Sequence, residues 1–172
     1  IAPCKPEHRD VTMRNLVRVE GMSLKAMELG IDWEFESFPE YLNHLESKGV
    51  GPNVGAFVGH SSIRTHVMGA EAAHRQATEV EIDSMCEIVA GGLEAGAVGF
   101  ATSTSPSHNG ADGYPMPSRL ADKEELRRLV GVLGELRKGV FMLTKGGPTP
   151  IPFLEKLAAD TQRPVMVAAL LH

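Results

Sequence analysis

The chain has 172 residues, of which 42% are hydrophobic and 23% are charged, and its formal net charge is −5. This composition is typical of a globular protein with room for one packed domain, and it excludes a disordered chain. No run of Lys or Arg could follow a phosphate backbone, and no apolar stretch approaches the roughly 18 residues of a membrane span. We therefore expect neither nucleic acid nor a membrane as a partner.

Residues 1–37 differ in pattern from the rest and are predicted to form a helical lid or covering segment. One helix is expected to open at Pro6, and a second to run from Ser23 to Leu29. The chain begins at Ile1 without the plan of a signal peptide, so we interpret it as part of a longer protein. Cys4 and Cys86 form no CxxC pair, which favours reduced thiols and a cytoplasmic location.

Residues 38–172 repeat one plan, in which a helical pattern, a glycine, a short apolar strand and a polar loop follow one another. Thr78 with Glu81, and Asp122 with Glu125, have the spacing of a capping box at a helix start. Continuous apolar strands that alternate with helices predict a parallel sheet buried on both faces. The expected helices are 38–46, 78–95, 122–138 and 150–159, and the expected strands are 53–60, 97–102, 140–144 and 164–172.

Two architectures fit this alternation, a β/α barrel and an open doubly wound sheet. The open sheet would favour a GxGxxG turn after the first strand, and the sequence has none. Gly91 and Gly92 lie inside a helical pattern, where they indicate close helix packing. We therefore predict an α/β fold of successive parallel β/α units, as in a TIM barrel.

Reactive groups of β/α barrels lie at the carboxyl ends of the strands, and several polar residues occur at such ends here. His60 and His172 end apolar runs, and imidazole is a common zinc ligand, although a lone histidine there can equally be a hydrogen-bonded structural residue. Lys145 could bind an anionic substrate, or ligate a metal after carboxylation. His60 and Lys145 are thus candidate catalytic residues, and His108 in the long loop 103–120 could approach the same place.

Other motifs point to no further chemistry. Lys145-Gly146-Gly147 lacks the GxxxxGK[ST] frame of a phosphate-binding loop, and Ser61-Ser62 lacks the GxSxG elbow of a serine hydrolase. Cys86 is expected to be a packed thiol within a helix. The remaining histidines have polar neighbours and are expected on the solvated surface: His8, His44, His66 and His74.

Several strings resemble one family in combination, although each string alone is common. The chain resembles the N-acyl-D-amino-acid deacylases (D-aminoacylases) of the amidohydrolase superfamily over nearly its whole length. The matching strings are Ile1–Glu7, Trp33–Tyr41, Asn53-Val54, Val58–His60 with Arg64 and Met68-Gly69, Glu94–Thr102, Tyr114-Pro115 and Glu124–Leu126.

This resemblance implies the middle portion of a (β/α)8 metal-dependent hydrolase that cleaves C–N bonds, with N-acyl-D-amino acids as substrates. It implies one or two zinc ions and identifies His172 with the histidine metal ligand of the family's SHxK strand. The implied partners are a small-molecule amide substrate and the rest of the barrel or an oligomer partner. This portion alone is expected to be inactive, because most of the family's metal ligands would lie outside it.

One motif departs from the family pattern. Where the family has THxR, with a metal-binding histidine, this chain has Thr144-Lys145-Gly146. A protonated ammonium cannot ligate zinc, so Lys145 would be a metal ligand only if deprotonated or carboxylated. Two alternatives therefore stay open: a catalytically inactive barrel that serves in binding or assembly, and a cyclic amidase of the hydantoinase or dihydroorotase kind.

Overall fold

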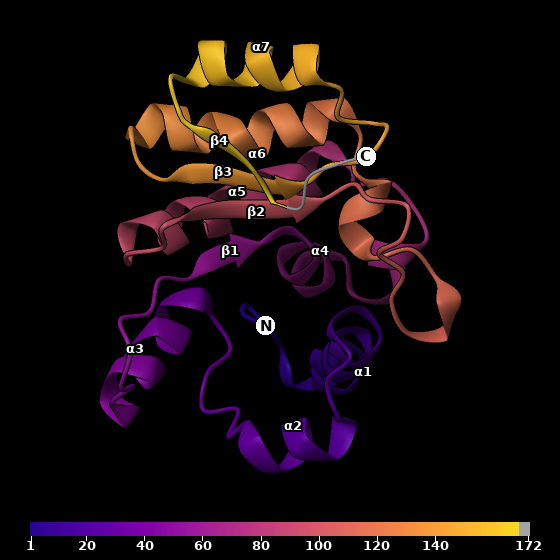
Figure 1. Ribbon diagram of the computed structural model, residues 1–172, viewed down its shortest axis with the longest axis vertical. Helices are drawn as coiled ribbons and strands as arrows, with labels where there is room; N and C mark the ends of the chain where they lie inside the picture. The colour runs from indigo at the N-terminus through magenta and orange to yellow at the C-terminus, as the bar shows by residue number, and fades with distance from the viewer. Residues whose placement is uncertain (169–172) are drawn as a thin grey trace.

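A computed structural model describes residues 1–168 as an α/β unit in which helices precede and alternate with strands (Figure 1). The helices are α1 Arg9–Glu20, α2 Leu24–Gly30, α3 Phe38–Lys48, α4 His60–Met68, α5 Glu79–Glu94, α6 Lys123–Leu136 and α7 Ile151–Thr161. The strands are β1 Phe57–Gly59, β2 Gly99–Ser103, β3 Val140–Thr144 and β4 Val165–Ala168. Short 3-10 turns occupy Pro6–His8, Gly69–Ala73, Ala111–Gly113 and Pro117–Leu120.

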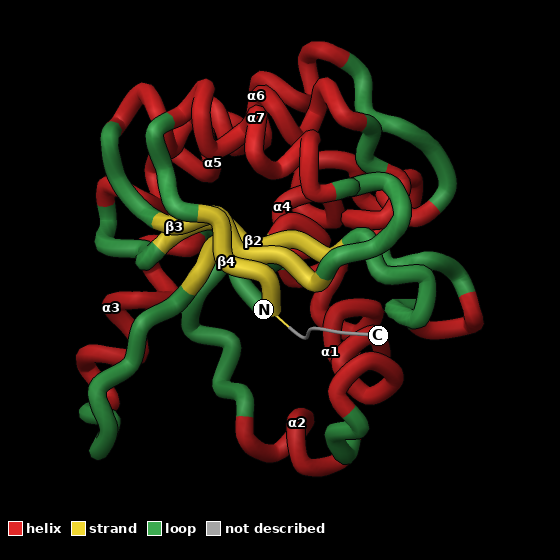
Figure 2. Tube along the Cα trace, turned by 45° about the horizontal axis from the view of Figure 1, so that its top comes forward, coloured by secondary structure: helices red, strands yellow, loops and turns green. Residues whose placement is uncertain are grey.

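The four described strands form one parallel sheet in the order β1-β2-β3-β4. Each strand therefore pairs with its successor in the chain, and α5, α6 and α7 pack side by side on one face of the sheet (Figure 2). A doubly wound sheet reverses its strand order at a switch point, and this sheet has no reversal among the described strands. The prediction of parallel β/α units is confirmed.

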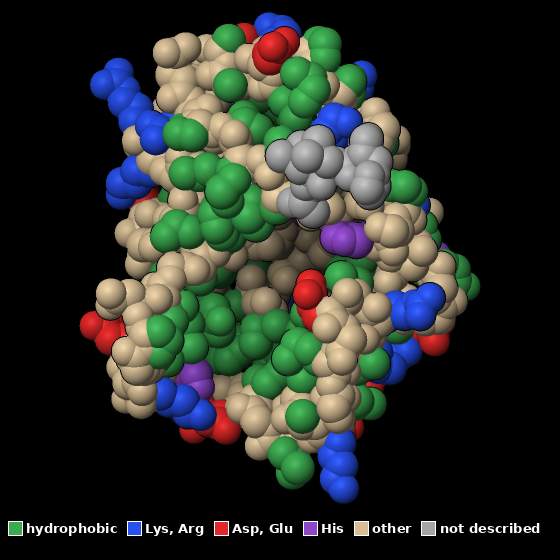
Figure 3. Space-filling view, viewed as in Figure 1, with side chains coloured by type: hydrophobic (Ala, Val, Ile, Leu, Met, Phe, Trp, Pro, Cys, Tyr) green, Lys and Arg blue, Asp and Glu red, His purple; other side chains and the backbone are tan. Residues whose placement is uncertain are grey.

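The core lies between the sheet and these helices. Phe141 and Leu143 of β3 are fully buried and alternate with the partly exposed Met142, because successive side chains of a strand point to opposite faces. Met142 is in register with Ala101 and with Met166, which is 44% exposed. The expectation of burial on both faces was therefore wrong for this row of residues. In the space-filling view, hydrophobic side chains lie to the left of a central hollow and below it (Figure 3).

The helices predicted from the sequence are confirmed to within a few residues at their ends. The strand predicted at 53–60 is much shorter, since only Phe57–Gly59 is a strand and His60 already begins α4, a helix that the sequence did not reveal. The first residues pack into the structure, since Ala2 and Cys4 are each 2% exposed. The division into residues 1–37 and 38–172 stays a prediction, and residues 169–172 lie outside the described range.

The pair Gly91-Gly92 shows why α5 approaches the sheet so closely. A Cβ atom on Gly92 would lie 2.5 Å from Val58 Cγ2 and 3.3 Å from Phe38 Cδ1, whereas one on Gly91 would meet nothing within 4 Å. Only Gly92 is therefore required for packing, and Gly91 merely weakens the helix.

These neighbouring glycines provide a matched pair of variants. Gly92→Ala is expected to destabilise the protein by about 1–3 kcal/mol, because the rigid Val58 side chain must move. Gly91→Ala is expected to be neutral or to stabilise by up to about 1 kcal/mol through helix propensity. Denaturant unfolding of both variants measures the two effects, and equal effects would contradict the close packing of Gly92 against Val58.

Candidate functional site

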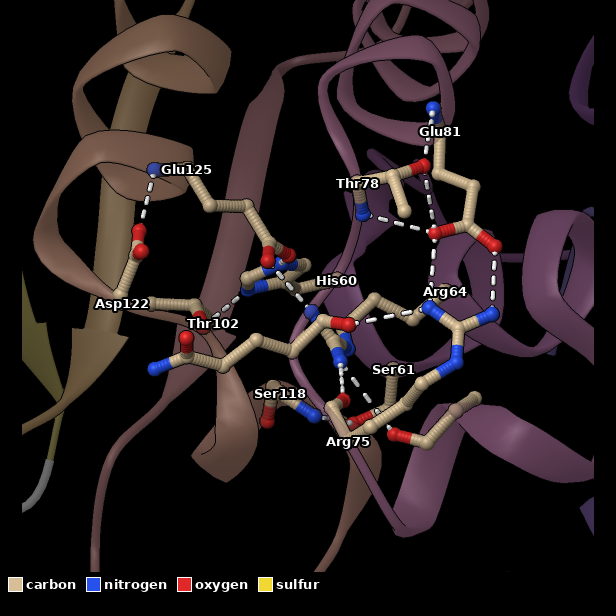
Figure 4. Close-up of polar contacts among 12 residues, drawn as sticks. His60, Ser61, Arg64, Arg75, Thr78, Glu81, Thr102, Ser118, Asp122 and Glu125 are labelled. Carbon is tan, nitrogen blue, oxygen red and sulfur yellow. Dashed lines mark hydrogen bonds and ion pairs between the residues drawn. The ribbon is translucent and has the colours of Figure 1, made fainter.

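Four buried polar side chains connect the carboxyl ends of β1 and β2 with the start of α6 (Figure 4). His60 Nδ1 lies 2.7 Å from Thr102 Oγ1, and His60 Nε2 lies 2.7 Å from Glu125 Oε1. The second carboxylate oxygen of Glu125 accepts a hydrogen bond from Arg64. The side chains of His60 and Arg64 are 0% exposed and that of Glu125 is 1% exposed. We call these residues the His60–Glu125 cluster.

The electrostatics of the cluster determine which atoms hold protons. Burial lowers the pKa of His60 more than Glu125 raises it, so the imidazole is neutral at pH 7. Burial alone would raise the pKa of the Glu125 carboxyl, but the hydrogen bonds from His60 and Arg64 and the charge of Arg64 outweigh it and lower this pKa overall. A carboxylate can only accept, so we assign the ring hydrogen to Nε2, and Nδ1 accepts from the Thr102 hydroxyl.

Arg64 extends the cluster to the start of α5. Its Nη2 donates to the backbone oxygens of Arg75 at 2.7 Å and Ala72 at 3.4 Å, while its buried Nε has no protein partner in the described structure. Arg75 in turn forms two hydrogen bonds with Glu81, which lower the pKa of the Glu81 carboxyl to about 2. Glu81 also completes the predicted capping box with Thr78.

The side chains of this cluster bind one another at the carboxyl ends of the strands. His60, predicted as a candidate catalytic residue, has both ring nitrogens occupied and a fully buried side chain. The geometry favours its alternative role as a hydrogen-bonded structural residue, and a catalytic role stays an untested prediction.

Sequence reasoning missed Arg64 and Glu125 as partners of His60. Glu125 was expected to cap α6, but only half of that box forms: Asp122 accepts from the Glu125 backbone at 2.8 Å, while the Glu125 side chain turns inward. The signal was its spacing, since Glu125 stands four and seven residues before Leu129 and Val132 and so lies on the buried face of the helix.

A hollow of about 210 Å³ lies at the carboxyl ends of β1 and β2. His108 lines it, as the sequence suggested, and its Nδ1 lies 2.7 Å from Ser103 Oγ. Ser118 fastens the long loop to the sheet and to α4, because its backbone N–H donates to Ser61 Oγ and its hydroxyl donates to the Ser103 carbonyl. The hollow is lined by Val19, Glu20, Gly59, His60, Ser61, Ser62, Ala101, Thr102, Ser103, His108, Met116 and Ser118.

Lys145 directly follows β3, and its side chain is exposed. The backbone of the turn that it begins is fixed by hydrogen bonds. The buried hydroxyls of Thr104 and Thr149 lie 2.7 Å apart, and Thr104 Oγ1 accepts from the Gly146 backbone at 2.8 Å. A Cβ atom on Gly146 would lie 2.0 Å from the Thr104 carbonyl oxygen, so only glycine fits there. Lys145 is thus a solvent-facing cation on a fixed turn at the carboxyl end of the sheet.

The described residues do not fit a zinc site by themselves. Within residues 1–168, no three His, Cys, Asp or Glu side chains are grouped so that they could hold a metal ion. An ammonium group at Lys145 has no lone pair to donate, and His172, the predicted metal ligand, lies outside the described range.

The other predicted surface residues have mixed outcomes. The His44 side chain is only 10% exposed and packs against Phe35, so the expectation of a solvated histidine was wrong there. His74 contacts the Tyr114 ring edge-on at 4.7 Å. Cys86 is half-buried within α5, as predicted, and burial raises the pKa of its thiol.

Among residues 1–168, no helix combines the length and the apolar character needed to cross a membrane.

A parallel β/α sheet with polar groups at the carboxyl ends of its strands is the arrangement of a β/α enzyme domain. Comparisons with solved structures show which proteins share this arrangement. The structure of N-acyl-D-glutamate deacylase from Bordetella bronchiseptica, complexed with zinc and a phosphonate inhibitor, matches 81% of this chain with a TM-score of 0.62 and 25% identity. A D-aminoacylase crystal structure, described as defining a novel subset of amidohydrolases, matches 77% with a TM-score of 0.60 and 27% identity.

Curated sequences give the same result over shorter stretches. A D-aminoacylase from Alcaligenes xylosoxydans xylosoxydans is 33% identical over 79 residues, or 46% of this chain. An uncharacterised protein of Mycobacterium tuberculosis is 32% identical over 102 residues, or 55% of this chain. No family model matches the chain. The resemblance to the D-aminoacylases and N-acyl-D-amino-acid deacylases is confirmed, and the chain spans 16% of the length of these curated relatives and 28% of the Bordetella enzyme.

The cluster makes a sharp prediction about two adjacent glutamates. Glu125→Gln is expected to cost about 3–5 kcal/mol, because it leaves the buried Arg64 charge without its counter-charge. Glu124→Gln, on the same turn but 55% exposed, is expected to change stability by no more than about 0.5 kcal/mol. Thermal or denaturant unfolding of the two variants measures this difference, and equal values would mean that Arg64 has another partner.

The protonation of His60 predicts a pH dependence. Its pKa lies below 6.5 in the folded state, so below pH 6.5 the unfolded chain binds a proton that the folded chain does not. Stability is therefore expected to be complete above pH 6.5 and to fall as the pH decreases from there. Unfolding curves between pH 5 and 8 should show a weaker slope for His60→Gln than for the unchanged protein. His66→Gln is expected to weaken the slope as well, because burial also lowers the pKa of His66.

Proposed function

We propose that the protein to which this chain belongs is a metal-dependent amide hydrolase of the amidohydrolase kind, and that the chain supplies neighbouring β/α units of its barrel. The observation that carries the proposal is the structural match to N-acyl-D-glutamate deacylase over 81% of the chain. The sequential strand order supports a barrel, because a closed barrel requires each strand to pair with its successor.

The partly open sheet face supports the same architecture. In a closed barrel, the row Ala101, Met142 and Met166 would point into the interior, where side chains from the other strands fill the space. We therefore propose the rest of the barrel as the partner of this face. An oligomer partner is the alternative, and the cytoplasmic location stays a prediction.

The proposed substrates are N-acyl-D-amino acids, which carry an amide bond and a free carboxylate. The fixed turn after β3 gives Lys145 a suitable position to bind that carboxylate, and this use of the ammonium needs no deprotonation. Zinc stays part of the proposal through the relatives: the Bordetella enzyme was complexed with zinc, and D-aminoacylase is described with a binuclear metal centre. His172 is the proposed ligand from this chain.

A second candidate function is a catalytically inactive barrel that binds a small molecule or serves in assembly. It is favoured by Lys145, which stands at the position of a family metal ligand. The two candidates differ in metal content, which can be measured without knowing the substrate.

Elemental analysis of the full-length protein tests the proposal first. Bound zinc that is lost in His172→Ala would support the hydrolase, whereas a protein that takes up no metal on reconstitution would favour the inactive barrel. Hydrolysis is then assayed with N-acyl-D-amino acids, their L-enantiomers, hydantoin and dihydroorotate. Activity on the two cyclic amides alone would replace the deacylase with a cyclic amidase.

The lysines at the two ends of β3 provide a matched test of substrate binding. Lys145→Ala is expected to raise KM by roughly tenfold to a hundredfold, the effect of losing one hydrogen bond to a charged group. Lys138→Ala, at the amino end of the strand, is expected to leave KM unchanged because that end of a β/α barrel holds no active site. Equal effects of the two substitutions would reject the carboxylate contact.

A further inference from the structure

The hollow beside His108 has a polar lining with one acidic side chain and no basic Lys or Arg side chain among the described residues. Its polar side chains include the hydroxyls of Ser61, Ser62 and Ser103, the imidazole of His108 and one carboxylate, Glu20, while no Lys or Arg belongs to the described lining. A second carboxylate would meet repulsion there, so the substrate's own carboxylate is not the group that this hollow accommodates. An uncharged group that accepts a hydrogen bond fits its chemistry.

His108 is held so that one ring nitrogen remains for such a group. Ser103 Oγ accepts the Ser105 backbone N–H at 3.3 Å and lies 2.7 Å from His108 Nδ1. We assign the Ser103 hydroxyl hydrogen to His108 Nδ1, which leaves the ring hydrogen on Nε2. In this tautomer, the nitrogen that Ser103 does not bind is a hydrogen-bond donor.

The backbone of His108 is fixed from several sides. Its carbonyl oxygen accepts from the Met116 backbone at 3.1 Å and from Arg119 Nη1 at 3.2 Å. The same loop is bound to α1, because Asn15 Oδ1 accepts from the Ala111 backbone at 2.8 Å. A donor held in this way binds a ligand without a large loss of conformational entropy, so the imidazole is preorganised.

We propose that His108 contacts the substrate and determines specificity, donating a hydrogen bond from Nε2 to the uncharged acyl part of an N-acyl amino acid within this hollow. This inference rests on the proposed function and divides the substrate between two groups: Lys145 binds the carboxylate and His108 binds the acyl oxygen. Ser103 is a positioning residue, because it acts only through the imidazole.

Kinetics of the full-length protein with an N-acetyl-D-amino acid and its carboxamide test this division. His108→Ala is expected to reduce kcat/KM on the order of tenfold for both compounds, the effect of about one hydrogen bond. His108→Gln, which keeps a side-chain N–H donor, should restore most of the loss. Lys145→Ala should affect only the compound with the free carboxylate. A His108→Ala effect that disappears with the carboxamide, or no effect at all, would overturn the proposal.

A binding measurement separates this inference from the proposed function. Histidine ring ¹⁵N resonances of the full-length protein are followed while N-acetyl-D-alaninamide, an uncharged probe, is added. A saturable shift of the His108 Nε2 resonance, absent in His108→Gln and unchanged in His74→Gln, supports the site even if no hydrolysis is found. Hydrolysis without any shift at His108 would overturn the site and leave the proposed function intact.

Discussion

The buried Glu125 carboxylate is the interaction on which the carboxyl end of this sheet depends. It receives hydrogen bonds from His60 and from Arg64, so α6 is linked to the first turn of α4, and through His60 to Thr102 at the end of β2. A buried charge is costly unless it is paired and hydrogen-bonded, and here both oxygens are occupied. The strand ends that carry Ser103 and the hollow are therefore held by electrostatics as well as by packing.

In the proposed site, different residues provide rigid support and ligand contact. His60, Arg64 and Glu125 are buried and hydrogen-bonded to one another, while His108 and Lys145 reach the surface at the same end of the sheet. Hydroxyl groups lie next to both sets of residues. Thr102 is hydrogen-bonded to His60 and Ser103 to His108, and Thr104 accepts a hydrogen bond from the backbone of the turn that follows Lys145. Catalytic sites require this combination, because a ligand-binding group is only as well placed as the residues that hold it.

The similarity to D-aminoacylases concerns the fold, whereas the unusual Lys145 concerns the chemistry of the site. The fold similarity concerns the backbone, and about a quarter of the aligned residues are identical to those of the solved structures. A single strand-end residue can change the chemistry of a barrel without altering its fold, since function depends on the site and not on the architecture. The described residues accordingly support the deacylase fold more directly than they support a particular metal centre.

The sequence by itself determined the elements and their order. Helical periodicity, the Thr78–Glu81 capping box and apolar strand runs are local signals, and they predicted α5, α6 and a parallel sheet. Only the tertiary structure decided where Glu125 points, because capping and core burial share the same position in the first turn of a helix. It alone also decided that His108 meets Ser103 and that one face of the sheet is partly open. Such contacts join distant segments, and no local pattern encodes them.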